Sequence, residues 1–222
     1  MTERETSSVD GLVIGILGGT GDQGRGLARR FALAGHPVII GSRSDERAHA
    51  AAQEIGYNVR GLANAGAARE AGVVIAAVPW EGHGDLLSGL TAELAGKIVV
   101  DCVNPLGFDQ RGAYALPVAE GSAAQQAAVL LPDSRVVAAF HHVSAVLLLD
   151  PEVDTIDLDV LVLGDDRQAT DLVQALAARI PGVRGIYAGR LRNCGQIEAL
   201  TANLVSINRR YKAHAGLRIT DI

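Results

Sequence analysis

The chain contains 222 residues with a net charge of −5, and 48% of its residues are hydrophobic while only 4% are aromatic. This length can bury the core of one large or two small domains, built mainly from Ala, Val, Leu and Ile. The negative charge, without a supporting motif, argues against nucleic-acid binding, and no apolar run reaches the roughly 18 residues that span a membrane.

The N-terminal residues and the cysteines favour a cytoplasmic protein. Residues 1–11 are mostly polar, lack the apolar core of a signal peptide and are expected to form a flexible tail. Cys102 and Cys194 do not make a disulfide framework, and we expect them to be buried free thiols. No Cys/His cluster has metal-ligand spacing, so no metal site is expected.

The stretch Leu12–Gly26 has the order strand, tight turn, helix. An apolar run is followed by G-x-G-x-x-G at Gly19, Gly21 and Gly24, and then by a helical pattern that ends at Gly35. The first glycine allows the turn, the second lets a pyrophosphate approach the backbone, and the third lets the helix pack close to the strand. This predicts a dinucleotide-binding loop, and the alternative is a glycine-rich turn without a ligand.

The end of the second expected strand, residues 37–41, favours NADP(H) over NAD(H). An acidic residue there would hold the ribose 2′-hydroxyl of NAD. The chain instead offers Ser42 and Arg43, with Arg47 one helical turn further on, and Thr20 in the glycine loop adds a hydroxyl. Arg presents a planar set of donors that suits a phosphate. The alternative is that Ser42 only caps the next helix and Arg43 is solvated.

Strands and helices alternate along the first two thirds of the chain. Six strands are expected at residues 12–17, 37–41, 58–62, 73–78, 97–102 and 135–140. Helices are expected between them at residues 45–55, 63–71, 84–94 and 122–131, in addition to the one after the glycine loop. This alternation predicts an α/β fold with a Rossmann-type, doubly wound, mostly parallel sheet.

Two residues follow strands at the edge where open α/β sheets bind ligands. Trp80, after the fourth strand, could border a nicotinamide ring or simply pack in the core. Asn104, after the fifth strand, could bond a carboxamide or a ring carbonyl.

Beyond Ser144 the pattern changes and predicts a domain boundary. Residues 12–145 are expected to form the dinucleotide-binding domain, and residues 146–222 a smaller C-terminal α/β-helical domain. Acidic residues between positions 150 and 159 predict a solvated connection rather than a metal site, because they are not confined to one face. Further strands are expected at residues 158–163 and 183–188, and helices at 167–180 and 196–212.

Charge is distributed unevenly along the chain. Residues 1–178 hold 12 Lys or Arg and 23 Asp or Glu, whereas residues 179–222 hold 8 and 2. This asymmetry indicates either an anionic partner near the C-terminus or basic side chains that pair with acids elsewhere in the chain.

The last helix carries an apolar stripe with spacings of three and four residues, which places its members on one face. They are Ile197, Leu200, Leu204, Ile207 and Tyr211. The simplest interpretation is packing against residues 144–190, and a subunit interface is the alternative.

Six segments occur together: GILGGTGDQGRGLARRFALAGH, GSR, VPWE, KIVVDCVNPL, AFHHVSA and AGRLRNCGQIEALTANLVSIN. In this combination the chain resembles the NADPH-dependent coenzyme F420 reductase family (F420H2:NADP+ oxidoreductases). The glycine loop occurs in many dehydrogenases, but the joint occurrence of the other segments is more specific. The resemblance covers most of residues 12–222.

The resemblance implies a homodimeric enzyme that transfers a hydride reversibly between NADP(H) and the deazaflavin coenzyme F420. It implies that NADP is held by the glycine loop, by the end of the second strand and by the VPW segment: Gly19, Thr20, Gly21, Asp22, Gln23, Gly24, Ser42, Arg43, Arg47, Pro79 and Trp80. It implies a deazaflavin pocket formed by Asn104, Pro105, His141, Val143, Ser144 and Ala145. The domain formed by residues 146–222 would add to this pocket and to dimer contacts.

For such a transfer the protein mainly orients two cofactors, so no dedicated acid–base residue is expected. None of the tyrosines is followed by Lys four residues later, so the Tyr-x-x-x-Lys pair of another reductase group is absent. His141 is a candidate for bonding the deazaflavin edge, and the alternative is a structural histidine that closes a strand. The remaining lone histidines are expected at the surface or at helix ends: His36, His49, His83 and His214.

Two other functions remain open. A reductase of a small imine or β-hydroxy acid would usually add a large helical domain, whereas only about 70 residues follow the nucleotide domain here. An NADP-binding sensor without turnover would bind NADPH but reduce no deazaflavin or flavin. A ferric reductase domain would be fused to membrane helices.

Overall fold

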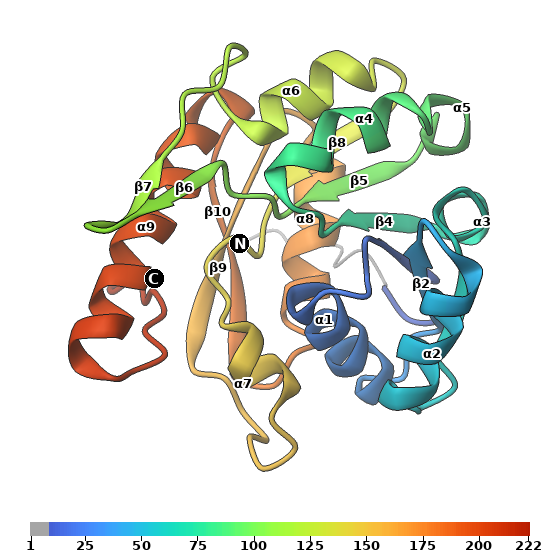
Figure 1. The fold of residues 1–222 in the computed structure, drawn as a ribbon, viewed down its shortest axis with the longest axis horizontal. Coiled ribbons are helices and arrows are strands. Elements are labelled where there is room, and N and C mark those ends of the chain that lie inside the picture. The colour runs from blue at the N-terminus through green and yellow to red at the C-terminus, as the bar shows by residue number, and fades with distance from the viewer. Residues whose placement is uncertain (1–8) are drawn as a thin grey trace, which may run out of the picture.

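The structure is a computed structural model that describes residues 9–222. Most of the tail expected at residues 1–11 therefore lies outside the described residues. The main sheet has eight strands in the order β10-β9-β8-β5-β4-β1-β2-β3 (Figure 1). Its strands are β1 (Ile14–Leu17), β2 (Val38–Ser42), β3 (Arg60–Ala63), β4 (Val73–Ala76), β5 (Ile98–Asp101), β8 (Arg135–Ala138), β9 (Leu158–Gly164) and β10 (Val183–Gly189).

Helices cover both faces of this sheet. They are α1 (Asp22–Leu33), α2 (Asp45–Ile55), α3 (Asn64–Glu70), α4 (His83–Ser88), α5 (Thr91–Leu94), α6 (Ala123–Leu130), α7 (Ala145–Leu149), α8 (Arg167–Ala177) and α9 (Cys194–Tyr211). Two single 3-10 turns, η1 (Trp80–Gly82) and η2 (Leu191–Asn193), precede α4 and α9. The expected doubly wound α/β fold is confirmed.

Two apolar layers hold the helices to the sheet, because successive strand residues point to opposite faces. Ile14 and Ile16 of β1 face the layer that includes side chains of α1, α2, α7 and α8. Leu17 faces the layer that includes side chains of α3, α4, α5 and α6. Figure 1 shows α4, α5 and α6 on one side of the sheet and α1 and α2 on the other.

Strand β9 reverses the direction of the sheet. It pairs with β8 antiparallel through only two residue pairs, Val137 with Gly164 and Ala138 with Leu163. The first part of β9, residues 158–162, therefore projects beyond the carboxyl end of β8. Strand β10 pairs with β9 in parallel along this projection, so the two strands form a wall beside the carboxyl edge of the parallel strands.

The sheet is thus continuous across residue 145, where the sequence predicted a domain boundary. That boundary remains a prediction. Within residues 9–222 no helix is long and apolar enough to cross a membrane.

Three local elements differ from the expectations. Strands β6 (Leu106–Asp109) and β7 (Gly112–Ala115) form an antiparallel hairpin that the sequence did not indicate, because both are short and contain few β-branched residues. The single helix expected at residues 84–94 is divided into α4 and α5 at Gly89. Helix α7 begins within the segment expected to be a connection.

Arg30 explains how the short helix α7 is held. Its buried guanidinium donates to the backbone carbonyls of Leu148 (2.9 Å) and Val153 (2.7 Å), and also to those of Leu147 and Asp150. Arginine can satisfy several carbonyls at once because it presents five N–H donors.

The last helix does not pack as expected. Helix α9 lies mainly on β7 and α6 rather than on residues 144–190. Its apolar stripe is buried only in part, since Ile207 and Tyr211 are 40% and 73% exposed.

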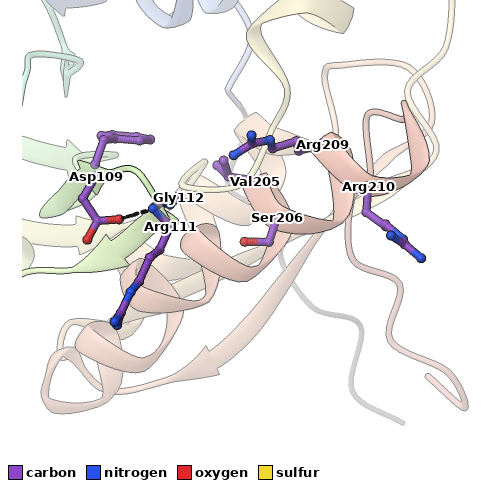
Figure 2. A pocket seen from close by; sticks show the side chains of 9 residues that line it. Asp109, Arg111, Gly112, Val205, Ser206, Arg209 and Arg210 are labelled. Carbon is purple, nitrogen blue, oxygen red and sulfur yellow. Dashed lines mark hydrogen bonds between the residues drawn. The ribbon is translucent and has the colours of Figure 1, made fainter.

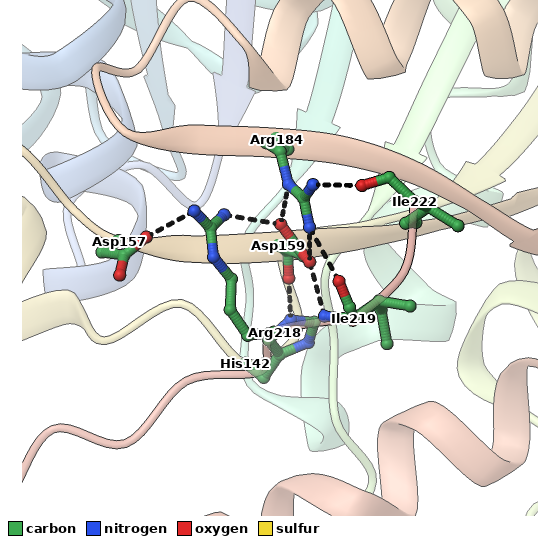
Figure 3. Close-up of polar contacts among 7 residues, drawn as sticks. All are labelled: His142, Asp157, Asp159, Arg184, Arg218, Ile219 and Ile222. Atoms are coloured by element: carbon green, nitrogen blue, oxygen red, sulfur yellow. Dashed lines mark hydrogen bonds and ion pairs between the residues drawn. The ribbon is translucent and has the colours of Figure 1, made fainter.

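The acidic connection is also not uniformly solvated, because Asp159 lies in β9 and is fully buried. Arg184 Nε and Nη2 donate to its two carboxylate oxygens, both at 2.7 Å, and Arg218 Nη1 donates at 2.8 Å (Figure 3). The backbone N–H of Ile219 adds a fourth donor at 2.7 Å. These bonds fasten the C-terminal segment to β9, and the hydrogen bonds from Arg184, with those from Ile219 and Arg218, hold the pKa of Asp159 below its usual value.

We expect Asp159→Asn to lower the Tm by about 5–10 °C at pH 7, because it leaves buried donors without their charged acceptor. Asp157→Asn is the matched control. Asp157 pairs with the same Arg218 but is exposed, so its loss should change the Tm by less than about 2 °C.

The same comparison has a pH dependence. Because the folded pKa of Asp159 is depressed, its stabilisation is present above the ordinary Asp pKa of about 4 and is lost as the pH falls below it. The gap in Tm between wild type and Asp159→Asn should therefore narrow on acidification. An equal Tm for the two proteins at pH 7 would contradict this account.

Candidate functional site

The carboxyl ends of five parallel strands meet at one edge of the sheet. Strand β1 lies between β2 and β4, and β5 lies between β4 and β8, all in parallel register. The segments that follow these strands include every position at which the sequence predicted a cofactor or substrate contact. In an open α/β sheet this edge is where ligands bind.

The glycine loop is close-packed at two of its glycines and open at the third. A Cβ on Gly24 would lie 2.6 Å from the Cα of Gly19, and a Cβ on Gly19 would lie 2.8 Å from the carbonyl oxygen of Ile16. Side chains at these positions would push α1 away from β1. A Cβ on Gly21 would meet nothing closer than 3.9 Å, so the backbone at Gly21 borders open space that a ligand can occupy.

The start of α1 supplies unused donors. Gly21 is the N-cap and has no capping side chain, so the first N–H groups of α1 have no intrahelical partner. Gln23 points its side chain elsewhere, since its Nε2 donates to the carbonyl of Phe140 at 3.2 Å. Backbone N–H groups are therefore the donors that this loop can offer to an anion.

The end of β2 places a hydroxyl and two cations together. Ser42 is buried, whereas Arg43 and Arg47 are exposed and form no ion pair among residues 9–222. The helix cap is Ser44, whose Oγ accepts from the N–H of Arg47 at 3.4 Å, so the alternative role of Ser42 as the cap of α2 is wrong.

Behind Trp80 lies a buried polar chain that the sequence did not reveal. His83, expected at the surface or a helix end, does begin α4 but is fully buried. Its Nε2 lies 2.6 Å from Asp101 Oδ2, and its Nδ1 lies 3.0 Å from Gln126 Oε1. The ring of Trp80 lies 5.6 Å from the His83 ring, centroid to centroid.

This chain favours a protonated His83. The amide of Gln126 is oriented by its Nε2, which donates to Glu120, so Gln126 Oε1 must accept from His83 Nδ1. Burial alone would lower the pKa of His83, but the hydrogen bond and charge of Asp101 raise it above the usual value. The other oxygen of Asp101 accepts from the N–H of Val103 at 3.0 Å, which fixes the loop that leads to Asn104.

Glu198 of α9 fastens that helix to the same region. It is buried and accepts from the N–H groups of Ala123 (2.8 Å) and Ala124 (3.2 Å) at the start of α6. Burial raises its pKa to about 7, although these two hydrogen bonds oppose the shift.

Asn104, His141 and Thr201 meet at the carboxyl edge. Asn104 Nδ2 donates to the carbonyl of His141 at 2.8 Å, and Thr201 Oγ1 lies 3.4 Å from both Asn104 Oδ1 and that carbonyl. The sequence predicted the first two residues but not Thr201. The helical periodicity of α9 could have indicated Thr201, because it lies four residues after Ile197.

The two neighbouring histidines differ in their contacts. His141 is buried, neither of its ring nitrogens has a hydrogen-bond partner, and burial lowers its pKa to about 4. His142 is also buried, but its Nε2 donates to the carbonyl of Asp159 at 2.7 Å and so joins this segment to β9. The neutral ring of His141 is therefore the one with unused polar atoms.

The remaining predicted deazaflavin residues lie in the same region. Pro105 and Val143 are buried, and Val143 belongs to the apolar core. Ser144 is the N-cap of α7, which begins at Ala145, and its Oγ lies 3.4 Å from His214 Nδ1.

The basic C-terminal residues divide into two groups. Some pair with acids of this chain, as the second explanation proposed: Arg179 with Asp10, Arg184 with Asp159, Arg190 with Asp165, and Arg218 with Asp157 and Asp159. The others form no ion pair within residues 9–222: Arg192, Arg209, Arg210 and Lys212. Cys102 and Cys194 are buried free thiols, as expected, and no group of residues within 9–222 could hold a metal ion.

Comparison with known proteins decides the family. Residues 13–105 match the family described as coenzyme F420-dependent NADP oxidoreductase. The F420-dependent NADP reductase of Methanothermobacter marburgensis is 42% identical, over 94% of this chain and 98% of that protein. The chain belongs to the F420-dependent NADP reductase family. A member from Methanocaldococcus jannaschii is 40% identical, over 94% of this chain and 98% of its own length.

Solved structures agree with this family and with the fold. A structure from Arthrobacter sp. FB24, named for an F420-dependent NADP reductase, superposes with a TM-score of 0.82 at 27% identity. It covers 95% of this chain and 100% of the other. A pyrroline-5-carboxylate reductase from Coxiella burnetii, at 15% identity and a TM-score of 0.64, covers 91% of this chain and 68% of its own and shares the fold alone.

We predict that Asp101→Asn lowers the pKa of His83 from above to below about 6.5, since the substitution removes the charge that opposes the cost of burial. An NMR titration of the His83 imidazole in both proteins measures this shift. Because the folded pKa is raised, wild type should lose stability relative to Asp101→Asn as the pH rises above 6.5. A wild-type His83 that titrates below 6.5 would contradict the prediction.

Proposed function

We propose that this protein transfers a hydride reversibly between NADP(H) and the deazaflavin coenzyme F420. The relatives named F420-dependent NADP reductase support this activity. The structural observation that supports it best is the close-packed glycine loop, in which Gly21 borders open space next to a strand end with two arginines free of ion pairs.

The residues present fit an NADP phosphate set. The backbone at Gly21 and the first N–H groups of α1, at Asp22, Gln23 and Gly24, would bind the pyrophosphate, with Thr20 and Gly19 shaping the turn. Ser42, Arg43 and Arg47 would hold the 2′-phosphate. A guanidinium suits this role because it stays charged and offers parallel donors to phosphate oxygens.

The ends of β4, β5 and β8 would hold the two ring systems. Pro79 and Trp80 would border the nicotinamide, and Trp80 is supported from behind by His83. The deazaflavin would lie against the segment that contains Asn104 and Pro105 and against the segment from His141 to Ala145. The unbonded ring nitrogens of His141 would be available to its polar edge.

These residues orient and shield rather than exchange protons. NADPH and coenzyme F420 supply the hydride chemistry themselves when they are bound. Proximity and alignment of two bound rings account for much of the rate in such a transfer. The low pKa of His141 keeps its imidazole neutral at pH 7, which suits a hydrogen-bonding role and not that of a general acid.

We further propose that the enzyme is a cytoplasmic homodimer. The family resemblance supports the dimer, and the two buried thiols are compatible with a reducing compartment. Light scattering of the purified protein tests the oligomeric state.

Stopped-flow absorbance tests the activity. Purified protein is mixed with NADPH and oxidised coenzyme F420, and in a parallel experiment with NADH. We expect rapid loss of the deazaflavin band with NADPH and little loss with NADH. Bound NADPH without reduction of any deazaflavin would favour the sensor function instead, and equal rates with NADH would contradict the 2′-phosphate site.

Arg43→Gln should raise the Kd for NADPH about tenfold and leave the Kd for NADH unchanged, because one charge-assisted contact to the 2′-phosphate is lost. Arg167→Gln is the matched control, since Arg167 is an exposed arginine of α8 whose only ion pair is with Asp171. An equal loss of affinity for both nucleotides in Arg43→Gln would show that Arg43 does not recognise the 2′-phosphate.

A further inference from the structure

A pocket of about 550 Å³ lies between the β6–β7 hairpin and the C-terminal half of α9 (Figure 2). Its lining includes Arg111 of the hairpin turn and Arg209 and Arg210 of α9, against a single carboxylate, that of Asp109. None of the three arginines forms an ion pair within residues 9–222, whereas Arg184 and Arg218 are paired. The pocket therefore has an excess of positive charge that this part of the chain does not neutralise.

The hairpin turn holds Arg111 at the pocket. Asp109 Oδ1 accepts from the N–H groups of Arg111 (2.7 Å) and Gly112 (3.2 Å), and Gly112 has a φ of 123°, which favours glycine. The carboxylate of Asp109 is thus engaged by backbone donors. Phe108 in the same strand is 70% exposed, so an apolar ring also borders the pocket.

Figure 2 shows how the arginines differ in direction. Arg209 extends from α9 toward the hairpin, whereas Arg210, the next residue of the same helix, points away from it. Arg111 extends outward from the turn. Arg111 and Arg209 are therefore the two side chains placed to reach a ligand between the hairpin and the helix.

The pocket continues from the proposed deazaflavin site. Thr201, Val205 and Arg209 are spaced four residues apart and share one face of α9. At 1.5 Å per residue, Arg209 lies about 12 Å along the helix from Thr201, which contacts Asn104 and His141. The hairpin leaves the same place, because β6 begins directly after Pro105.

We infer that this pocket binds the anionic tail, phosphate and glutamyl carboxylates, of the deazaflavin whose ring lies at Asn104 and His141. The inference rests on the proposed function. The 2′-phosphate of NADP already has a proposed site at the end of β2, which lies on the other side of β1 from β5 and β8. Guanidinium groups bind phosphate and carboxylate oxygens through parallel hydrogen bonds, which suits either part of the tail.

The test compares coenzyme F420 with the deazaflavin that lacks the phosphate and the glutamyl tail. Dissociation constants are measured without NADPH, from deazaflavin fluorescence at low ionic strength, for wild type, Arg209→Gln, Arg111→Gln and the matched control Arg210→Gln. We expect Arg209→Gln and Arg111→Gln each to raise the Kd for coenzyme F420 about five- to tenfold. The Kd for the tail-less deazaflavin should stay within about twofold in every variant, and Arg210→Gln should change neither Kd by more than this.

Several results would overturn the inference. One is equal wild-type affinity for the two deazaflavins, and another is an equal effect of Arg210→Gln and Arg209→Gln, which would indicate general charge attraction. A change of oligomeric state in Arg209→Gln, measured by light scattering, would assign the surface to a subunit contact. Wild-type reduction of coenzyme F420 with unchanged Kd in both variants would overturn only this inference, whereas a wild type that neither binds nor reduces it would also overturn the proposed function.

Discussion

The antiparallel pairing of β9 with β8 is the constraint on which the rest of this site depends. Because that pairing involves only two residue pairs, β9 projects past the ends of the parallel strands, and β10 extends along it. The buried carboxylate of Asp159 stabilises the projection by binding Arg184 and Arg218. His142 then joins this wall to the end of β8 through the carbonyl of Asp159, so the wall and the strand ends form one edge.

Helix α9 closes this edge from the other side and joins three functions in one element. Glu198 caps α6 near its start, Thr201 contacts Asn104 and the His141 carbonyl in its middle, and Arg209 lines the basic pocket near its end. A displacement of α9 would therefore change the deazaflavin site and the proposed tail pocket together. The buried pair of His83 and Asp101 supports the opposite side, behind Trp80 and the loop to Asn104.

Local patterns in the sequence predicted the sheet, its order of elements and the candidate nucleotide residues well. The glycine loop and Ser42-Arg43 are short motifs whose chemistry depends on neighbours in the chain. The sequence could not reveal contacts between distant residues, such as His83 with Asp101 or Arg218 with Asp159, which are 18 and 59 residues apart. It also missed the β6–β7 hairpin, because strands of four residues with two glycines carry little periodicity.

The central claim is that bound NADPH and coenzyme F420 exchange a hydride directly while the protein orients them. The most direct measurement uses NADPH deuterated at the transferred C4 position, with mass spectrometry of the reduced deazaflavin. The account predicts one deuterium on the deazaflavin carbon C5, without loss to solvent, and a slower transfer than with unlabelled NADPH. A reduced deazaflavin that carries only solvent hydrogen would contradict it, because the hydrogen would then have passed through an exchangeable group.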